Sequence, residues 1–493
     1  MSFAFRLVSP PWRDALMSLG FLGLLGCSPE TGAMGSGGAA GRAGVGAGGA
    51  SGGGGRVSNT GGAGSAAGST PVSGAGGGSA GDGVSGGGAN HGGAAGRAST
   101  GGTGGLVSAS GAMNDGGRGG ASGGSESGGA SGSGGVASGG ASGNAGAAPG
   151  GAGNVVDAAA MVKAMGFGTN IGNTLENTTS WETGWGQPLI SKAYIDGVAS
   201  HGFKTVRVPV AWDTYAVNGV VDSTKMDRVK EVVGWIEAAG MYSIVNIHWD
   251  GGWIDNDTEG NPNRYKLTSD VTTKFSSYWT QIATAFSSIG HKLIFEALNE
   301  ESKFYVNGDT NQGPDYAPLN TLNQLFVTTV RGQGGYNATR ALLIAGFTTD
   351  IDLTCVDAFK IPSDPAGAGK LFLSLHYYTP YTFCGLDTVE SWGSPQTTWG
   401  TSAEKATLEM LFDRLGSYST QKGVPVILGE FAVTRGESYP RDPASRTLWM
   451  QSVADSSFSR GIVPVLWDTG SEISRTDGAL SSELQSVMNG LEP

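Results

Sequence analysis

The sequence predicts an α/β protein in which residues 154–493 form a (β/α)8 TIM barrel, preceded by a long disordered linker rich in Gly, Ser and Ala. Two observations predict the barrel. Short apolar runs alternate with amphipathic helical stretches through this region, which is the pattern of repeated β-α units. In addition, polar and aromatic residues follow the ends of several runs, and the carboxyl ends of all strands in such a barrel share one mouth.

The segment before the barrel has two parts. Residues 1–27 carry Arg6 and Arg13 before an apolar run and end in Leu24-Leu25-Gly26-Cys27, which resembles a bacterial lipoprotein signal peptide with Cys27 as the lipidated residue. Residues 28–153 contain most of the 88 glycines and no apolar periodicity. Such a segment cannot offset its chain entropy by burial, so we expect a disordered linker. We therefore expect an exported protein, either an outer-membrane lipoprotein at the cell surface or an extracellular protein.

Eight apolar runs are the predicted strands. They are Gly166–Gly172, Thr205–Val210, Tyr242–His248, Lys292–Leu298, Arg340–Gly346, Leu371–Tyr377, Val424–Phe431 and Ile462–Trp467. Helical periodicity between them is clearest over 225–239, 272–288, 402–422 and 443–460. A doubly wound open sheet would need a phosphate-binding Gly-x-Gly-x-x-Gly turn after its first strand. Gly166, Gly168 and Gly172 do not have that spacing, so the barrel is favoured.

Net charge and the histidine and cysteine content limit which classes of ligand and partner we expect the protein to bind. The net charge of −12 argues against binding of nucleic acid, which needs a basic surface. The five histidines have no metal-ligand spacing, and the calcium-loop-like start at Asp255 has Lys266 where a bidentate Glu is required. Cys355 and Cys384 either pair or remain buried thiols. We expect no metal, no cofactor, no membrane contact except the lipid anchor, and a monomer.

The chemistry-bearing side chains fall at strand ends. Arg207 lies in the second run, His248 ends the third, Asn299 and Glu300 follow the fourth, His376 and Tyr378 end the sixth, Glu430 ends the seventh and Trp467 ends the eighth. Two glutamates at one mouth, without a metal site or nucleotide loop, indicate glycoside hydrolysis, which needs one carboxylic acid and one carboxylate. Aromatic rings beside them would stack on sugar rings.

Seven motifs in order along residues 151–493 carry a family resemblance. They are Gly-Thr-Asn-Ile-Gly-Asn-Thr-Leu-Glu (168–176), Gly-Trp-Gly-Gln-Pro (184–188), Val-Arg-Val-Pro-Val (206–210), Asn-Glu (299–300), His-Tyr-Tyr (376–378), Gly-Glu-Phe (429–431) and Trp-Asp-Thr-Gly (467–470). The chain resembles glycoside hydrolase family 5, and within it the subfamily 4 endoglucanases. The resemblance implies a (β/α)8 fold and retention of anomeric configuration.

The resemblance also implies roles for the matching residues. Glu300 matches the acid/base and Glu430 the nucleophile, and the charge of Glu430 is expected to raise the pKa of Glu300. The remaining matches concern substrate binding and the nucleophile's surroundings: Arg207, Tyr378, Asn299 toward the sugar 2-hydroxyl, His248, His376, Asn173, and Trp467 as stacking platform. One departure is Trp249, where relatives often have a second histidine.

The predicted activity is that of a retaining endo-β-1,4-glucanase acting on cellulose-like or mixed-linkage β-glucan. The alternatives are a xyloglucanase, a xylanase or a β-mannanase on the same scaffold, or a surface glycan-binding protein that has lost turnover. Glu296 lies inside a predicted strand and is interpreted as a buried structural partner. Five further tryptophans are candidates for either the cleft or the core: Trp181, Trp185, Trp212, Trp253 and Trp392.

Overall fold

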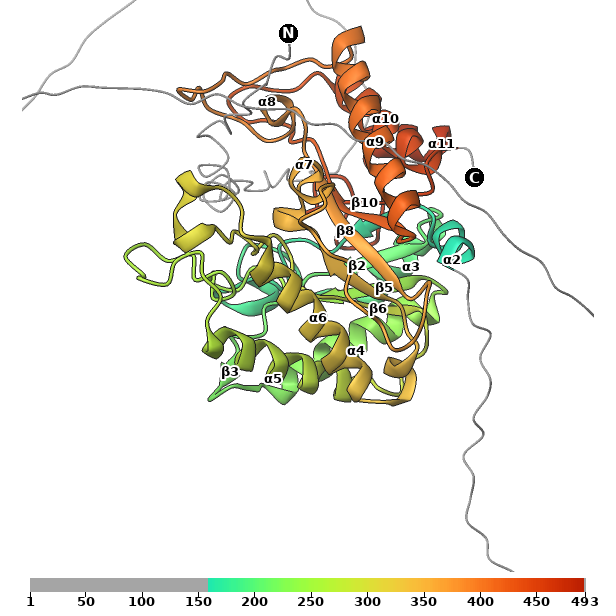
Figure 1. The fold of residues 1–493 in the computed structure, drawn as a ribbon. Helices are drawn as coiled ribbons and strands as arrows, with labels where there is room; N and C mark the ends of the chain where they lie inside the picture. Colours follow the sequence, from blue (N-terminus) through green and yellow to red (C-terminus); the bar gives the residue numbers. More distant parts are fainter. Residues whose placement is uncertain (1–157, 492–493) are drawn as a thin grey trace, which may run out of the picture. The chain divides into compact units, whose positions relative to one another are not determined.

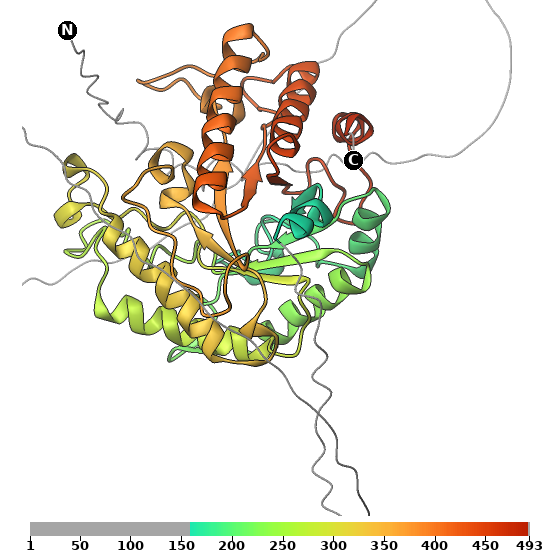
Figure 2. The ribbon, with the colours of Figure 1, turned by 45° about the vertical axis from the view of Figure 1, so that its right-hand side comes forward.

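Eight parallel strands close into a barrel in a computed structural model that describes residues 158–491 (Figures 1 and 2). The strands are β1 (Gly168–Asn170), β2 (Thr205–Val208), β5 (Tyr242–Asn246), β6 (Leu293–Glu296), β7 (Leu342–Ala345), β8 (Leu371–Tyr377), β9 (Val426–Phe431) and β10 (Val463–Leu466). Their order is β1-β10-β9-β8-β7-β6-β5-β2, and β1 pairs with β2 to close the ring. Each observed strand lies within a predicted run, so the predicted barrel is confirmed. The signal peptide and the linker predicted over 1–27 and 28–153 lie outside the described residues.

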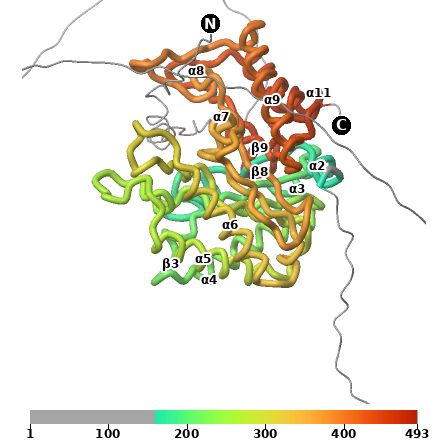
Figure 3. Tube along the Cα trace, in the orientation of Figure 1, coloured from blue at the N-terminus to red at the C-terminus, as the bar shows by residue number. Residues whose placement is uncertain are grey.

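Helices surround the strands on the outside of the barrel (Figure 2). They are α2 (Ala158–Met165), α3 (Lys192–Ser200), α4 (Ser223–Ala238), α5 (Ser269–Ala285), α6 (Tyr316–Gly332), α7 (Ile351–Thr354), α8 (Tyr381–Cys384), α9 (Ser402–Lys422), α10 (Pro443–Phe458) and α11 (Ser482–Gly490). A small hairpin of β3 (Ala216–Val217) and β4 (Val220–Val221) precedes α4. Short 3-10 turns occur at η1 (Trp181–Thr183), η2 (Val306–Gly308), η3 (Thr310–Gln312), η4 (Gly335–Ala338) and η5 (Phe347–Thr349). The blue-green start and the red end of the described chain lie on the same side of the barrel (Figure 3), as the pairing of β1 with β10 requires.

Helix ends follow local capping signals. Helix α9 begins and ends at the predicted residues because Thr401 and Glu404 form a capping box at its start and Gly423, with φ of 65°, ends it. Helix α10 begins after the N-cap Asp442, with a proline in its first turn. It ends two residues before the predicted boundary, within the usual uncertainty of helix ends.

The barrel interior changes from apolar to polar along its axis. A separate core cluster joins α2 to alternate strand residues, including Ile244, Ile294 and Phe372. Two residues further along β5 and β6 the side chains are Asn246 and Glu296, both fully buried. Because side chains alternate in a strand, these polar groups continue the same inward-facing row. The interior is therefore packed at one end and lined by hydrogen-bonding groups at the end where the strands finish.

Candidate active site

Arg207 is the centre of the polar end of the barrel. Its side chain is completely buried and donates in three directions. Nε bonds Glu296 at 2.7 Å, Nη1 bonds Glu430 at 2.7 Å, and Nη2 bonds the Asn299 side-chain oxygen at 2.8 Å. Although burial opposes its charge, Glu296 and then Glu430 raise the pKa of Arg207 overall. As a permanent cation, Arg207 thus fixes Glu296 at the end of β6, Asn299 just after it and Glu430 on β9.

Glu430 is held by two donors. Its Oε1 accepts the Arg207 bond, and its Oε2 accepts the Tyr378 hydroxyl at 2.9 Å. Its side chain is only 7% exposed, whereas that of Glu300 is 30% exposed. The less exposed carboxyl is therefore the one fixed at both oxygens, and the other reaches the open side of the site.

Glu300 and Glu430 face each other across a short gap. One carboxylate oxygen of Glu300, one carboxylate oxygen of Glu430 and one ring nitrogen of His376 all lie within 4.8 Å of one another. His376 lies between the two carboxyls, with Nδ1 2.7 Å from Glu300 Oε1 and 3.6 Å from Glu430 Oε2. The register shift between Leu375 and His376 places His376 opposite Glu430 on β9, so a local irregularity of the sheet brings this histidine to the pair.

The pKa directions of the two carboxyls differ from the sequence expectation. Burial raises the pKa of Glu430, against the pull of His376 and Arg207. Burial also acts on Glu300, but the hydrogen bond and charge of His376 lower the pKa of Glu300 overall. The contact with His376 therefore outweighs burial, and the pKa of Glu300 is lowered where the charge of Glu430 was expected to raise it. Two carboxyls this close titrate as a pair, so these directions describe how the pair shares protons.

His248 and Trp467 form the aromatic side of the site. The side-chain oxygen of Asn246 accepts the backbone N–H of Val210 at 3.3 Å, so its amide nitrogen, 3.2 Å away, faces His248 Nδ1. Burial, followed by Arg207 and His376, lowers the pKa of His248 well below its usual range. The imidazole is thus neutral, with its proton on Nε2. Its ring is parallel to that of Trp467, with centroids 5.7 Å apart.

Asn173 follows β1 in the left-handed region, with φ of 61°. The Glu176 carboxylate accepts the backbone N–H of both Asn173 and Thr174, which stabilises this conformation. Just before it, Gly172 packs against Trp467: a Cβ there would lie 2.7 Å from the Asp468 carbonyl oxygen and 3.0 Å from Trp467 Cζ2. The loop after β1 therefore lies directly against the loop after β10.

Most candidate residues come together, but the sequence missed several supporting ones. Asn170 bonds Arg207 Nη1 at 3.0 Å, and the Ser374 hydroxyl donates to Glu296 at 2.6 Å. Glu296 is the buried structural partner that the sequence predicted. Asn170 ends β1 and Ser374 lies in the middle of β8, and buried polarity inside an otherwise apolar strand is the signal that could have found them.

The secondary candidates divide between core and surface. Trp212 is core, with its indole donating to the Asn246 carbonyl at 2.8 Å, and Trp181 is buried against Tyr215. Three others are half-buried: Trp185, Trp253 and Trp392.

Cys355 and Cys384 are both free thiols. No helix in the described part of the chain is long and apolar enough to cross a membrane.

One group of side chains among residues 158–491 is close enough to hold a metal ion. It is the set Glu300, His376 and Glu430 itself. The Arg207 guanidinium, 2.7 Å from Glu430, opposes a second cation there by charge repulsion. In the calcium-like segment, the Lys303 ammonium bonds Asp257 at 2.9 Å and supplies the positive charge.

A parallel barrel with two facing carboxyl groups and aromatic rings at its mouth defines the class of carbohydrate-cleaving enzymes. A family model described as Cellulase (glycosyl hydrolase family 5) matches residues 162–472. The chain belongs to glycoside hydrolase family 5, and it is a glycoside hydrolase.

Relatives and solved structures agree with this membership. Endoglucanase A of Paenibacillus barcinonensis is 34% identical over 343 residues, covering 64% of this chain and 82% of the relative. A xyloglucan-specific endo-beta-1,4-glucanase of Bacteroides ovatus is 31% identical over 360 residues, covering 68% of this chain and 69% of the relative. The structure of a GH5-4 broad specificity endoglucanase from an uncultured bovine rumen ciliate has a TM-score of 0.60 and 32% identity, and the match covers 68% of this chain and 99% of that one.

Proposed function

We propose that the protein is a retaining endo-β-1,4-glucanase that cleaves internal bonds of cellulose-like or mixed-linkage β-glucan by double displacement. The observation that carries this proposal is the separation of the two glutamates, whose nearest oxygens lie within 4.8 Å. Retaining glycosidases hold their carboxyls about 5–5.5 Å apart, whereas inverting enzymes leave room for a water molecule. The names of several relatives support the endoglucanase activity.

Glu430 is the nucleophile in this proposal. The hydrogen bonds from Arg207 and Tyr378 fix its carboxylate and favour its charged form. One of its oxygens attacks the anomeric carbon and forms a glycosyl ester as the glycosidic bond breaks. The leaving oxygen takes its proton from Glu300, which is the more exposed of the two carboxyls.

Substrate binding changes which of the two carboxyls, Glu300 or Glu430, more readily holds a proton. The bond to His376 stabilises the charged form of Glu300 and lowers its pKa, against burial. When Glu300 turns to the glycosidic oxygen it loses this bond, while Glu430 keeps Arg207. Burial and the Glu430 charge then favour a proton on Glu300. After the ester forms, the charge of Glu430 is gone, and Glu300 can take a proton from the attacking water.

The neutral His248 presents its Nε2–H, Asn299 lies beside the pair, and Trp467 supplies an apolar face. These groups are the proposed contacts of the reacting sugar, together with Asn173, His376 and Tyr378. An imidazole that stays neutral can donate to a hydroxyl without adding a charge that would compete with Arg207 for Glu430.

A substrate panel tests the activity. Purified protein is incubated with carboxymethylcellulose, barley β-glucan, xyloglucan, xylan and mannan, and new reducing ends and product lengths are measured. We expect short and intermediate oligosaccharides from the β-glucans. Xyloglucan as the preferred substrate would favour the alternative that the Bacteroides ovatus relative suggests. Mannan or xylan as the preferred substrate would favour the mannanase or xylanase alternative. No product from any polymer would leave only a glycan-binding protein.

A mechanism-based label tests the nucleophile. A 2-deoxy-2-fluoro β-cellobioside with a good leaving group should form a stable ester on Glu430, because fluorine slows hydrolysis of the intermediate. Peptide mass spectrometry locates the label. A label on another residue would refute the assignment, and inversion seen by proton NMR of the products would refute double displacement.

We also propose that the protein is exported and tethered to the outer envelope as a monomer through a lipid on Cys27, with residues 28–153 as a spacer. The support is the signal-like sequence ending at Cys27 and the about 60 Å span of a flexible chain of this length. Replacement of Cys27 by Ala should move the protein from the membrane fraction to a soluble fraction. An unchanged distribution would contradict the anchor.

A further inference from the structure

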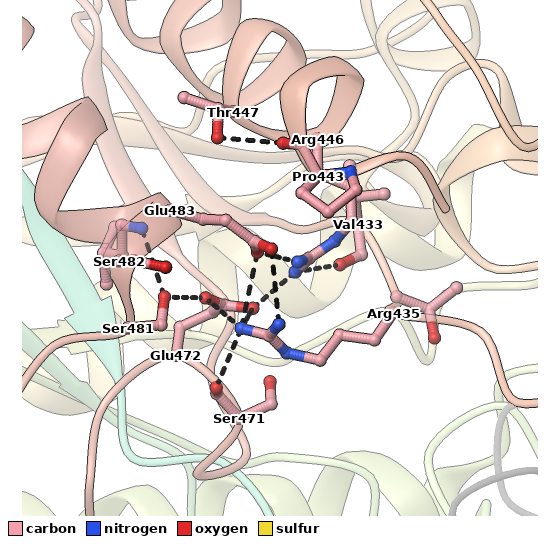
Figure 4. Close-up of polar contacts among 12 residues, drawn as sticks. Val433, Arg435, Pro443, Arg446, Thr447, Ser471, Glu472, Ser481, Ser482 and Glu483 are labelled. Carbon is pink, nitrogen blue, oxygen red and sulfur yellow. Dashed lines mark hydrogen bonds and ion pairs between the residues drawn. The ribbon is translucent and has the colours of Figure 1, made fainter. Parts of the chain in front are cut away.

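The loop after β10 is held by two groups of charged side chains, which the Glu472 N–H links by donating to Asp468 at 2.9 Å. Within the loop, Glu472 accepts Arg446 of α10 and also Arg435, the latter at 3.0 Å, and Glu483 at the start of α11 joins them (Figure 4). At its near end, Asp468 follows Trp467 directly and pairs with Arg475 at 3.4 Å.

Arg475 joins two loops. One nitrogen, Nη2, donates to the Asp468 carbonyl at 2.5 Å and to the Gly172 carbonyl at 3.1 Å. The other, Nη1, bonds the Tyr194 hydroxyl on α3 at 2.5 Å. The Arg475 side chain is 6% exposed and that of Asp468 is fully buried. A planar guanidinium can satisfy all these acceptors at once, which an ammonium cannot.

The two carbonyls that Arg475 binds are each one residue from a proposed sugar contact. Gly172 precedes Asn173, and Asp468 follows Trp467. The Gly172 N–H also donates to the Asp468 carbonyl at 2.9 Å, so the two loops touch under the Trp467 ring. A change in their separation would move the ring, because the space beside Gly172 is already filled.

We propose that Arg475 is a positioning residue for the donor side of the cleft: by binding Gly172 and Asp468 together it sets the separation of the loops after β1 and β10 and so fixes the Trp467 platform. This inference rests on the proposed function, because it assigns the ring to a sugar subsite. Arg446, on α10, binds Glu472 and Glu483 but not Gly172 or Asp468, so it holds α10 against this loop and the start of α11.

The test compares Arg475→Lys with Arg446→Lys, which change two buried arginines that hold the loop after β10, one from within the loop and one from α10. Both changes are made in the full chain carrying Glu300→Gln, which prevents turnover. Cellotriose affinity is measured by isothermal titration calorimetry at a temperature where thermal unfolding shows both proteins folded. We expect about tenfold weaker binding with Arg475→Lys, which corresponds to about 1.4 kcal/mol. With Arg446→Lys we expect lower thermal stability and an affinity within about twofold of the parent.

Parental affinity in folded Arg475→Lys would overturn the inference, and so would equal weakening by Arg446→Lys. If Arg475→Lys does not fold, Tyr194→Phe replaces it. That change removes one partner of Arg475 and keeps the arginine, so we expect two- to threefold weaker binding, and an unchanged affinity would again overturn the inference. A parent that does not bind cellotriose would overturn it too. Reducing ends released from β-glucan by the wild type then decide whether the proposed function fails as well.

Discussion

Two arginines are completely buried at opposite ends of the barrel, and they are satisfied in different ways. Arg207 lies at the mouth and pairs with two carboxylates, Glu296 and Glu430. Arg340 lies just before β7, at the amino-terminal end of the strands, and donates to the side-chain oxygen of Asn337 and to four backbone carbonyls at 3.0–3.3 Å, those of Phe286, Ile289, Gly290 and Leu293. The carbonyl of Phe286 belongs to the C-cap of α5, where the helix dipole is negative.

The difference appears in the pKa of each guanidinium. Carboxylates raise the pKa of Arg207 in spite of burial. Burial dominates at Arg340 and lowers its pKa to about 10. The buried Arg340 thus satisfies backbone carbonyls at the amino-terminal end of the barrel, whereas Arg207 holds the side chains of the proposed site at the mouth. Changes at the mouth should therefore affect turnover most, and changes at the bottom should affect stability.

The largest effect is expected at Glu430. Glu430→Gln removes the proposed nucleophile but keeps the shape and a partner for Arg207, so turnover on β-glucan should fall by about 10⁴-fold or more. Thermal unfolding should change by only a few degrees. Initial rates and calorimetry check both parts. A rate near that of the wild type would show that the mouth does not carry the chemistry.

Arg340→Met should lower stability and leave turnover unchanged, which is the opposite of the effect expected for Glu430→Gln. Loss of the guanidinium leaves several buried carbonyls without donors, so the free energy of unfolding should fall by about 3 kcal/mol. Turnover per folded molecule should be unchanged below the unfolding transition. Denaturant unfolding and active-site titration measure the two quantities. A specific loss of turnover would show that the two ends are coupled.

The pH dependence of stability should also come from the mouth. Burial raises the pKa of Glu176, which supports Asn173, from 4.5 to about 7, although backbone N–H groups and Arg475 oppose it. The folded protein therefore holds a proton that the unfolded chain releases, and stability falls as pH rises between about 4.5 and 7. Glu176→Gln should reduce that slope by up to about 1.4 kcal/mol per pH unit. Denaturant unfolding from pH 4.5 to 8 measures it, with exposed Glu259→Gln as the control. An unchanged slope would show that Glu176 does not cause this pH dependence of stability.

The smallest effects are expected at two glycines. Gly172→Ala at the mouth would clash with the Asp468 carbonyl and displace Trp467, so kcat/KM on β-glucan should fall by about tenfold. Gly234 lies in α4 with open space where a Cβ would be placed. Gly234→Ala should stabilise the fold by about 0.5–1 kcal/mol and leave kinetics unchanged. Equal kinetic effects of the two substitutions would remove the distinction between the regions.

Local signals predicted the elements well, because each strand and capped helix is marked within its own segment. Helix α9 was predicted with both of its ends, and the eight strands were placed within the eight apolar runs. The candidate site residues, which the structure brings together, could be named in advance because their position at a strand end is itself a sequence property. Asn170 and Ser374 were not found, since a single buried polar residue in a strand has many possible partners until the barrel closes.

The sequence by itself determined the barrel and placed Glu300 and Glu430 at strand ends, because periodicity and strand-end position are encoded along the chain. Only the tertiary structure decided the charge balance of the pair. His376 reaches Glu300 through the irregular register of β8 and β9, and this contact reversed the expected pKa direction of Glu300. Electrostatic energies depend on distances of a few ångströms between residues far apart in sequence, and closure of the barrel sets those distances.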